Sequence, residues 1–377
     1  MKTAQVTMMG AALMGGLAIA GYAAAQDDGS VAQHAVFVMT NDADANEVIA
    51  YERSEYGALH SPRRYQTGGR GSGGTVDPLS SQASLTLSDD RSVLLAANAG
   101  SGTLSVFRVF GSHLALTDRL PTGGSEPNAV AQRGDLVYVL NTAGSSSVVG
   151  FHLRQGHLQR IPDSLRFLSG NLANSSSIAF SHDGHYLIAI ERAGNKIDVF
   201  KVQSDDRLSA ITVNPSLGSG AFAGVFAPDG ALIVSETGPG GAASATLSSY
   251  QIGSQGQLIP VSSALPTLGA ANCWNAVTPD GRFVYASNAG SSSIAGFALG
   301  AGGALSALPG TIVGVNPSGS SNLDITVSAD GQFLYSLNAG SGTIGMFAIR
   351  PGDGTLTNLG IVGGLPAAAG LNGIAAN

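Results

Sequence analysis

A unit of about fifty residues repeats along this chain and limits its possible folds more than any other feature. Its clearest copies are TPDGRFVYASNAGSSSIAGF (278–297) and SADGQFLYSLNAGSGTIGMF (328–347). Each copy reads as a strand, an Asp-Gly turn, a second strand, a turn of small residues, and a third strand ending in Phe or Tyr. Six copies are complete, and counting from their turns puts the second-strand ends 43 to 51 residues apart, at Asn98, Asn141, Glu191, Thr237, Asn288 and Asn338. This is the period of a four-stranded propeller blade.

A seventh copy is divided between the two ends of the chain. HAVFVMTNDADANEVIAYERS (34–54) has a second and a third strand, and GLNGIAAN (370–377) has a first strand with nothing after it. Joining them closes the ring and leaves no open sheet edge. We therefore predict an all-β fold, a seven-bladed β-propeller of four-stranded antiparallel blades, with one blade closed by the N- and C-terminal strands.

The third strands of the complete copies share an aromatic residue. Because it recurs at one position of the repeat, we expect it to fill the space between neighbouring blades, as Phe107, Phe151, Phe200, Tyr250, Phe297 and Phe347. The glycine-rich stretch 67–82 breaks the repeat between the first and second blades. The sequence leaves open whether this stretch is a flexible excursion or a lid over the ring.

The N-terminus is typical of an export signal. A short basic start precedes the apolar run MMGAALMGGLAIAGYA, and small residues stand at Ala23 and Ala25. We predict a signal peptide over 1–25 that is cleaved after Ala25, a linker over 26–33, and one propeller domain over 34–377. No membrane span is expected, because the apolar run is short and rich in glycine. The mature protein is predicted to be periplasmic or secreted.

Composition excludes several classes of function. Cys273 is the only cysteine, so neither an intrachain disulfide nor a Cys/His zinc cluster is expected. The formal net charge is −7 and no basic stripe exists, which argues against nucleic-acid binding. We predict no metal and no cofactor, and the sequence leaves the oligomeric state open.

Propeller geometry nominates site residues without any motif. The starts of the first strands and the ends of the second strands lie on one face of a propeller, so their side chains converge there. At these places stand Asn128, Asn141, Trp274 and Asp324, which we predict to bind substrate. Trp274 is expected either to be a stacking platform for a ring-shaped ligand or to be wedged between blades. Most of the repeated asparagines are expected to cap their own turns.

Two places depart from the repeat and carry charge. We predict that Glu191 or Glu236 activates water or moves a proton, and that Arg192 stabilises an oxyanion. Asn128 and Asn141 would orient the substrate. These residues need no metal for that chemistry.

The repeated phrases resemble those of the seven-bladed propeller lactonase family, which includes propeller-type 6-phosphogluconolactonases and carboxy-muconate cyclases. The resemblance spans 34–377 and includes the strand GTLTNLG (354–360). It implies lactone hydrolysis or cyclisation, with Pro-His at a first-strand start and Asn-Glu at a second-strand end. Here Pro127-Asn128 and Glu191-Arg192 stand at such places.

Two functions from different classes remain open at this point. One is an exported lactonase-type hydrolase or cycloisomerase that acts on a small lactone or carbohydrate-like ligand at the central mouth. The other is a non-catalytic propeller that binds a ligand, glycan or protein, similar to surface-layer propellers. Fold alone does not choose between them.

Overall fold

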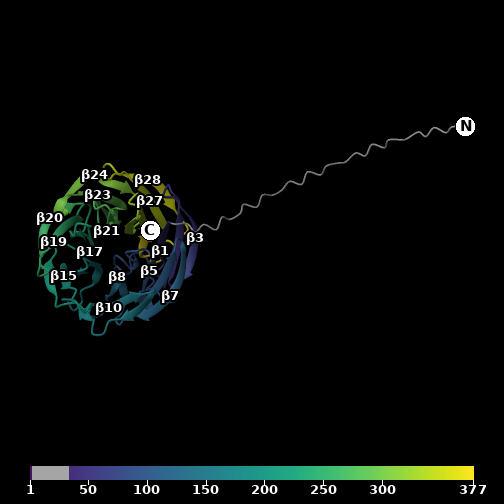
Figure 1. Ribbon diagram of the computed structural model, residues 1–377. Helices are drawn as coiled ribbons and strands as arrows, with labels where there is room; N and C mark the ends of the chain where they lie inside the picture. Colours follow the sequence, from purple (N-terminus) through teal and green to yellow (C-terminus); the bar gives the residue numbers. More distant parts are fainter. Residues whose placement is uncertain (2–33) are drawn as a thin grey trace. The chain divides into compact units, whose positions relative to one another are not determined.

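Seven antiparallel sheets form the blades of a ring in the computed structural model, which describes Met1 and residues 34–377 (Figure 1). Six sheets have four strands each, and the third blade carries one additional short strand. The predicted fold class is confirmed. The expected signal peptide and linker lie outside the described residues. Among the residues that are described, no helix is long and apolar enough to cross a membrane.

The strands follow the chain order within each blade, except that the last strand of the chain begins the first blade. Blades 1 to 3 contain β29 (Ile374–Ala376), β1 (Ala35–Met39), β2 (Glu47–Arg53) and β3 (Leu59–Gln66); β4 (Leu85–Leu87), β5 (Val93–Asn98), β6 (Thr103–Phe110) and β7 (His113–Pro121); and β8 (Pro127–Arg133), β9 (Leu136–Asn141), β10 (Ser147–Arg154) and β11 (His157–Arg160), with β12 (Arg166–Phe167) also on β10.

Blades 4 to 7 repeat this order without interruption. They contain β13 (Ser175–Phe180), β14 (Tyr186–Glu191), β15 (Lys196–Lys201) and β16 (Thr212–Pro215); β17 (Ala221–Phe226), β18 (Leu232–Glu236), β19 (Thr246–Ile252) and β20 (Leu258–Pro266); β21 (Asn272–Val277), β22 (Phe283–Asn288), β23 (Ser293–Leu299) and β24 (Leu305–Val315); and β25 (Asn322–Val327), β26 (Phe333–Asn338), β27 (Thr343–Ile349) and β28 (Leu356–Val362). The helical content of the described residues is three 3₁₀ turns, Ala99–Ser101, Ala289–Ser291 and Ala301–Gly303.

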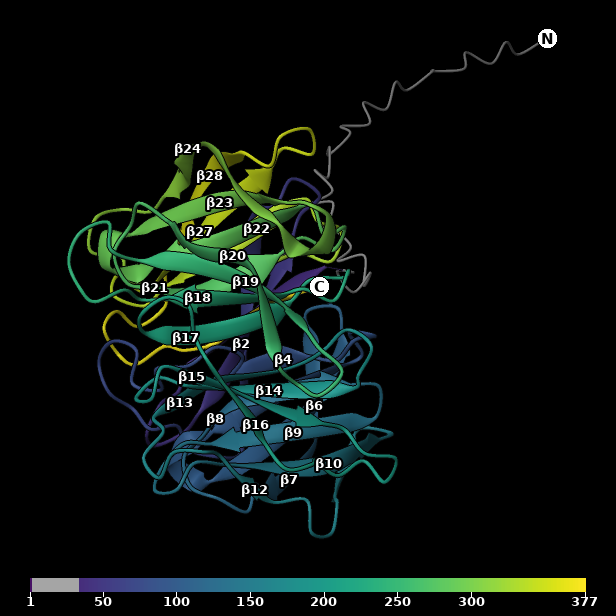
Figure 2. The same cartoon turned by 90° about the vertical axis from the view of Figure 1, so that its left-hand side faces the viewer.

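The first strand of each blade faces the centre of the ring. Figure 1 shows β8, β17 and β21 near the middle and β10, β20 and β24 at the rim, and Figure 2 shows the blades stacked side by side around that rim. We call the face where first strands begin and second strands end the upper face. The lower face carries the Asp-Gly turns between these strands.

Each Asp-Gly turn is fixed by a hydroxyl that precedes it. In blade 6 the Thr278 hydroxyl donates to Asp280 Oδ1 at 2.6 Å, and the same oxygen accepts the amide of Arg282 at 3.1 Å. Gly281 adopts a φ of 70°, which a residue without Cβ reaches at little cost. The Ser328–Asp330 turn of blade 7 repeats this arrangement at 2.6 Å.

Aromatic side chains join neighbouring blades, as the sequence predicts. The recurring third-strand aromatics are buried, and each packs in a cluster with residues of the preceding blade. Three second-strand tyrosines add hydrogen bonds to the next blade. Their hydroxyls donate across the gap between blades, from Tyr138 to the carbonyl of Asp206, from Tyr285 to that of Gly354, and from Tyr335 to that of Gly57.

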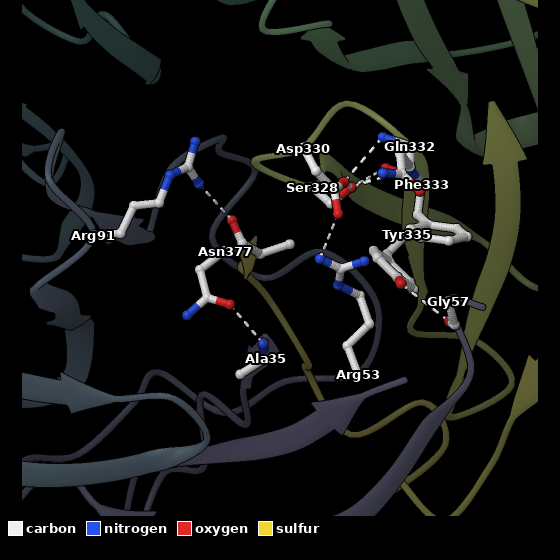
Figure 3. A network of polar contacts seen from close by, with 11 residues as sticks. Ala35, Arg53, Gly57, Arg91, Ser328, Asp330, Gln332, Phe333, Tyr335 and Asn377 are labelled. Atoms are coloured by element: carbon white, nitrogen blue, oxygen red, sulfur yellow. Dashed lines mark hydrogen bonds and ion pairs between the residues drawn. The ribbon is translucent and has the colours of Figure 1, made fainter. Parts of the chain in front are cut away.

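The chain termini close blade 1, which confirms the predicted closure. Strand β29 pairs with β1 in antiparallel register, and Phe37 lies opposite Ala375. The Asn377 side chain accepts the amide of Ala35 at 2.6 Å, and Arg91 of blade 2 donates to the carbonyl of Ala376 at 2.9 Å (Figure 3).

A buried arginine fastens this closed blade to blade 7. The Arg53 side chain is 1% exposed, and its Nη2 lies 2.8 Å from Asp330 Oδ2 (Figure 3). Its guanidinium also lies 5.1 Å from the centre of the Phe333 ring. A buried, planar cation that meets both a carboxylate and an aromatic face is well suited to hold two sheets together.

Replacing Arg53 with Leu should therefore weaken the ring seam. We expect the free energy of unfolding to fall by about 2 kcal/mol, because Asp330 keeps its other donors and is 27% exposed. Urea unfolding followed by tryptophan fluorescence measures this change. Arg64→Leu on β3 is the matched control, since Arg64 pairs with Glu47 at the surface and is 51% exposed. Equal losses in both variants would contradict a special role for Arg53.

Candidate functional site

The first strands bulge where they enter the channel. In five blades the register of the first two strands skips one residue near the upper face, and the skipped residues are Asn128, Ser176, Phe222, Cys273 and Asp324. A bulge redirects a side chain out of the regular alternation of a strand. Two of the five, Asn128 and Asp324, are predicted substrate-binding residues, and Cys273 precedes a third, Trp274.

Residues 75–84, which we call the central segment, lie among these bulges. The segment belongs to the long connection between blades 1 and 2, and it bonds with blades on several sides of the ring. The backbone amide of Gln82 donates to the carbonyl of Ser176 at 2.9 Å, and its side-chain Nε2 donates to the carbonyl of Asn275 at 2.9 Å. Thr75 accepts the amide of Gly370 at 2.7 Å. The connection is therefore not a flexible excursion, because hydrogen bonds hold it across the upper ends of several first strands.

Two of the predicted substrate-binding residues hold the central segment. Asn128 is buried and donates to the carbonyls of Leu79 at 3.3 Å and Ser175 at 2.9 Å. The Trp274 indole is buried and donates to the carbonyl of Ser81 at 2.8 Å, while its ring packs edge-on against Phe222. Both side chains do point to the channel interior, but their donors are bound to the protein's own backbone.

The residues at the ends of the second strands form a separate structural set, which we call the strand-end residues: Asn98, Asn141, Glu191, Glu236, Asn288 and Asn338. Strand pairing places Glu236, not Thr237, at this position of blade 5, because Ala221 pairs with Glu236 as Asn272 pairs with Asn288. The expectation that the asparagines cap their own turns is wrong for Asn98 and Asn288, which make no side-chain cap bond.

Five of the strand-end residues instead bind the connection that arrives from the preceding blade, whereas Asn98 accepts the side chain of Asn46, in the turn between β1 and β2, at 2.9 Å. Asn141 Oδ1 accepts the Thr122 hydroxyl at 2.6 Å, and Asn288 Oδ1 accepts the Thr267 hydroxyl at 2.8 Å. The third predicted substrate-binding residue, Asn141, is therefore 1% exposed beneath this connection.

Glu236 uses its own carboxylate to make the same contact with the arriving connection. It is fully buried, and its Oε1 accepts the hydroxyls of Ser216 and Ser248 and the amide of Gly218 at 2.7–3.0 Å. Its Oε2 accepts the Thr246 hydroxyl at 2.5 Å. Gly218 is required here, since a Cβ would lie 2.0 Å from Oε2. Four donors leave this carboxylate in a structural environment.

Glu191 is buried too, but it faces a second carboxyl group. Its Oε1 accepts the Ser169 hydroxyl at 3.0 Å and the Gly170 amide at 2.7 Å. Asp198 lies on the neighbouring strand β15, two residues after Lys196, which pairs with Glu191. Its carboxyl accepts the backbone amide of Ser169 at 2.8 Å. Burial raises the pKa of Asp198, and the negative charge of Glu191 raises it further. The neighbouring Glu191 therefore favours the protonated form of Asp198.

Arg192 is the predicted catalytic residue that reaches the channel. Its guanidinium lies 4.7 Å from the centre of the Phe222 ring, and it is partly exposed. The Cys273 thiol is buried nearby, and burial raises the pKa of this thiol well above its ordinary value. We call this place, with Asp77 and Asn372, the upper mouth.

Asp77 is the functional candidate that the repeat does not reveal. It lies in the central segment, adopts a left-handed φ of 48°, and accepts the Asn372 side chain at 3.2 Å. Burial raises the pKa of Asp77 to about 7, while the positive charge of Arg192 opposes the rise. A carboxyl whose pKa is raised toward neutrality within electrostatic range of an arginine is a candidate for proton transfer. The only signal in the sequence is the unusual length of its connection.

The last predicted substrate-binding residue, Asp324, lies deeper in the channel. It occupies the blade 7 bulge with a φ of 53°, is 3% exposed, and accepts the amides of Ile325 at 3.0 Å and Ile374 at 3.2 Å. Burial raises the pKa of Asp324 to about 7. Asp324 lines a cavity of about 280 Å³ on the lower side of Gln82. The structure thus separates Asp324 from Glu191 and Glu236.

Comparison with protein families matches a lactonase model, described as lactonase, 7-bladed beta-propeller, over residues 33–172 and 270–362. The match covers more than half of the chain. This chain belongs to the seven-bladed β-propeller lactonase family. A comparison with curated proteins found no match. Among the residues described here, no group of three or more His, Cys, Asp and Glu is placed to hold a metal ion.

Solved structures with the lactonase-family fold align over most of this propeller. A Bacteroides uniformis protein assigned as a 6-phosphogluconolactonase is 19% identical, with a TM-score of 0.67 over 92% of this chain and 100% of that one. The Pseudomonas aeruginosa periplasmic gluconolactonase PpgL is 18% identical, with a TM-score of 0.67 over 91% and 98%. A Lactobacillus plantarum protein is 17% identical, with a TM-score of 0.72 over 92% and 99%. These likenesses establish the shared fold.

The carboxyl pair of this lactonase-family propeller should be visible in the pH dependence of stability. Because the pKa of Asp198 is raised on folding, its ionisation opposes folding, and stability should fall as pH rises from about 4 toward neutrality. In Asp198→Asn the new amide can accept from Ser169 and donate to Glu191. We therefore expect the free energy of unfolding to rise by an amount on the order of 1–3 kcal/mol at pH 8 and to change little at pH 4.5. Urea unfolding at both pH values measures it.

The equivalent position of blade 2 offers a matched control. Ser105 also stands seven residues beyond its strand-end residue and accepts the Asn98 side chain at 2.8 Å. Ser105→Ala should lower stability by a similar amount at both pH values, since no titrating group is removed. An Asp198→Asn variant that behaves in the same pH-independent way would contradict the raised pKa of Asp198.

Proposed function

We propose that this chain is an exported hydrolase of small lactones whose reaction takes place at the upper mouth. The observation that carries the proposal is the Asp77 carboxyl in the central segment, whose pKa burial raises to about 7 and which lies within electrostatic range of the Arg192 guanidinium. Family membership supports lactone chemistry. The predicted signal peptide over 1–25 supports an extracytoplasmic location, the compartment given in the name of the Pseudomonas aeruginosa relative.

The two groups supply what lactone hydrolysis requires. The Asp77 carboxylate accepts a proton from water as its oxygen attacks the lactone carbonyl. Arg192 stabilises the negative charge that develops on the carbonyl oxygen. When the tetrahedral intermediate collapses, the ring C–O bond breaks and protonated Asp77 returns the proton to the leaving alkoxide. Lactone and water give a hydroxy acid, and Asp77 is regenerated.

The substrate that we propose is an uncharged lactone, such as the lactone of a sugar acid. Arg192 contributes a single positive charge, and the carboxyls of Asp77 and Asp324 lie close enough to influence each other. A phosphorylated substrate is better held by clustered cations. The Phe222 ring, already stacked on Arg192, offers an apolar face to one side of a lactone ring.

One observation favours the second candidate, a non-catalytic binding propeller. The central segment already occupies the donors of Asn128 and Trp274, which a substrate would otherwise use. In that case the upper mouth would bind a ligand without turning it over. Kinetics with a lactone separate the two functions.

The pH dependence of turnover tests the assignment of Asp77. We expect kcat/KM for D-glucono-1,5-lactone to rise with pH through about 7, because the ionised carboxyl is the active form. Asp77→Asn should lower kcat by about 10²- to 10⁴-fold. A pH-stat assay from pH 5.5 to 8.5, corrected for spontaneous hydrolysis, measures both. No turnover of this or other neutral lactones by the wild type would favour the binding propeller.

Arg192→Gln distinguishes charge stabilisation from simple structural support. We expect kcat to fall by about 10²- to 10³-fold, as when an oxyanion donor is lost. The rising limb of the pH profile should also move to higher pH, because Arg192 opposes the raised pKa of Asp77. Glu236→Gln is the control, and it should lower the unfolding midpoint while leaving kcat unchanged. A normal pH profile in Arg192→Gln would contradict the pairing with Asp77.

A further inference from the structure

On the lower face, second-strand aromatic side chains fill the gaps between several neighbouring blades. In blade 6 the Tyr285 hydroxyl donates to the carbonyl of Gly354, in the turn between the third and fourth strands of blade 7, at 2.7 Å. The Phe283 ring packs on the same glycine, where an added Cβ would lie 2.3 Å from a ring carbon. Phe333 of blade 7 packs in this way on Gly57 of blade 1. An aromatic side chain at this place therefore closes the gap between two blades.

Blade 2 departs from this pattern. Val93 and Leu95 stand where blade 6 has Phe283 and Tyr285, counted from the strand-end residue of each blade. The facing turn of blade 3 is short as well, since residues 155–156 alone separate β10 from β11. Small side chains and a short turn leave the gap between blades 2 and 3 open. It forms a cavity of about 640 Å³, which we call the interblade cavity and which has the size of a small-molecule site.

An arginine supplies donors to the interblade cavity. Arg108, near the end of β6, lines the cavity and is exposed. Its Nη2 donates to the carbonyl of Gln155 at 3.2 Å, and its guanidinium forms no ion pair with the residues that the structure describes. A guanidinium has five N–H groups, so Arg108 keeps donors that can reach a ligand.

Two carboxylates in the turn between β4 and β5 supply acceptors. The Asp89 side chain is 45% exposed, and its Oδ2 accepts the amide of Gly134 at 3.0 Å. Asp90 is also exposed, and it accepts from its serine neighbours through Oδ1, which leaves Oδ2 with capacity for another donor. Arg133 lies 3.6 Å from Asp89. Together with Arg108, these groups give the cavity exposed donors and acceptors without a net charge.

An exposed aromatic ring forms another part of the wall. Phe110 is the last residue of β6 and is 54% exposed, while Val93, Val109 and Leu153 add aliphatic surface. A wholly apolar ligand would leave Arg108 and the carboxylates without partners, and a charged ligand would meet a like charge. A neutral sugar meets neither difficulty. The C–H groups on the face of its ring pack against an aromatic side chain, and the hydroxyls at its edge both donate and accept.

We propose that the interblade cavity is a binding site for a short neutral saccharide, such as a disaccharide. One sugar ring stacks on Phe110, its hydroxyls donate to Asp89 and Asp90, and another hydroxyl accepts from Arg108. No bond is made or broken at this site. The cavity lies between the lower turns of blades 2 and 3, so it is separate from the upper mouth and does not depend on the lactonase proposal.

Calorimetric titration of the full propeller with cellobiose and with maltose tests this assignment. We expect saturable binding of at least one disaccharide with a millimolar Kd. Val93→Phe restores the aromatic residue of blades 6 and 7 and fills the cavity without removing a side-chain hydrogen bond, and Phe110→Ala removes the stacking surface. Each should weaken binding at least tenfold. Phe167→Ala is the matched control and should leave the Kd unchanged, because Phe167 is 57% exposed on β12 and does not line the cavity.

The outcomes distinguish this site from the upper mouth. Binding that is weakened in Val93→Phe and Phe110→Ala but kept in Asp77→Asn supports the interblade cavity. If Val93→Phe does not fold, the comparison of Phe110→Ala with Phe167→Ala decides. Binding that is lost in Asp77→Asn but kept in Phe110→Ala would overturn the proposal and place the saccharide at the upper mouth. Absence of saturable binding by either disaccharide would overturn it as well, whatever the result of the lactone assay.

Discussion

The ring depends on one repeated contact, the bond between a strand-end residue and the connection from the preceding blade. The described residues contain no disulfide and only short 3₁₀ turns, so each buried side chain that joins two blades contributes to closure. Asn141 and Asn288 accept a threonine hydroxyl, whereas Glu236 accepts two serine hydroxyls, a threonine hydroxyl and an amide. Amide and carboxylate serve the same purpose, because the partners are mainly donors.

This contact explains why a change in the repeat does not by itself identify chemistry. Glu191 and Glu236 differ from the asparagines in charge, yet they occupy the same buried position. The change at Glu191 is matched by Asp198 on the neighbouring strand, where blade 2 has Ser105. Both departures therefore have partners within their own blades, and such partners are visible only when the strands are in register.

The sequence was sufficient for the fold because the repeat encodes local features. Asp-Gly turns, alternating strands and a third-strand aromatic recur at fixed spacing, and each is satisfied within one blade or by its neighbour. A further pattern was available: a hydroxyl residue and a glycine two positions later follow several fourth strands, as in Thr267 and Gly269 or Ser216 and Gly218. That pattern predicts the binding of the connection to the strand-end residue.

The candidate site could be predicted only in part because a single non-repeating segment decides it. First-strand bulges at Asn128, Phe222 and Cys273 lie around the channel, and Trp274 follows the last of them. The path of residues 75–84 then determines which side chains are already hydrogen-bonded. Asn128 and Trp274 bind the segment. Arg192, packed on Phe222, instead lies within electrostatic range of Asp77. Gln82 of the same segment divides the channel. A symmetric ring thus acquires two chemically different compartments from one asymmetric connection, and neither could be inferred from the blades alone.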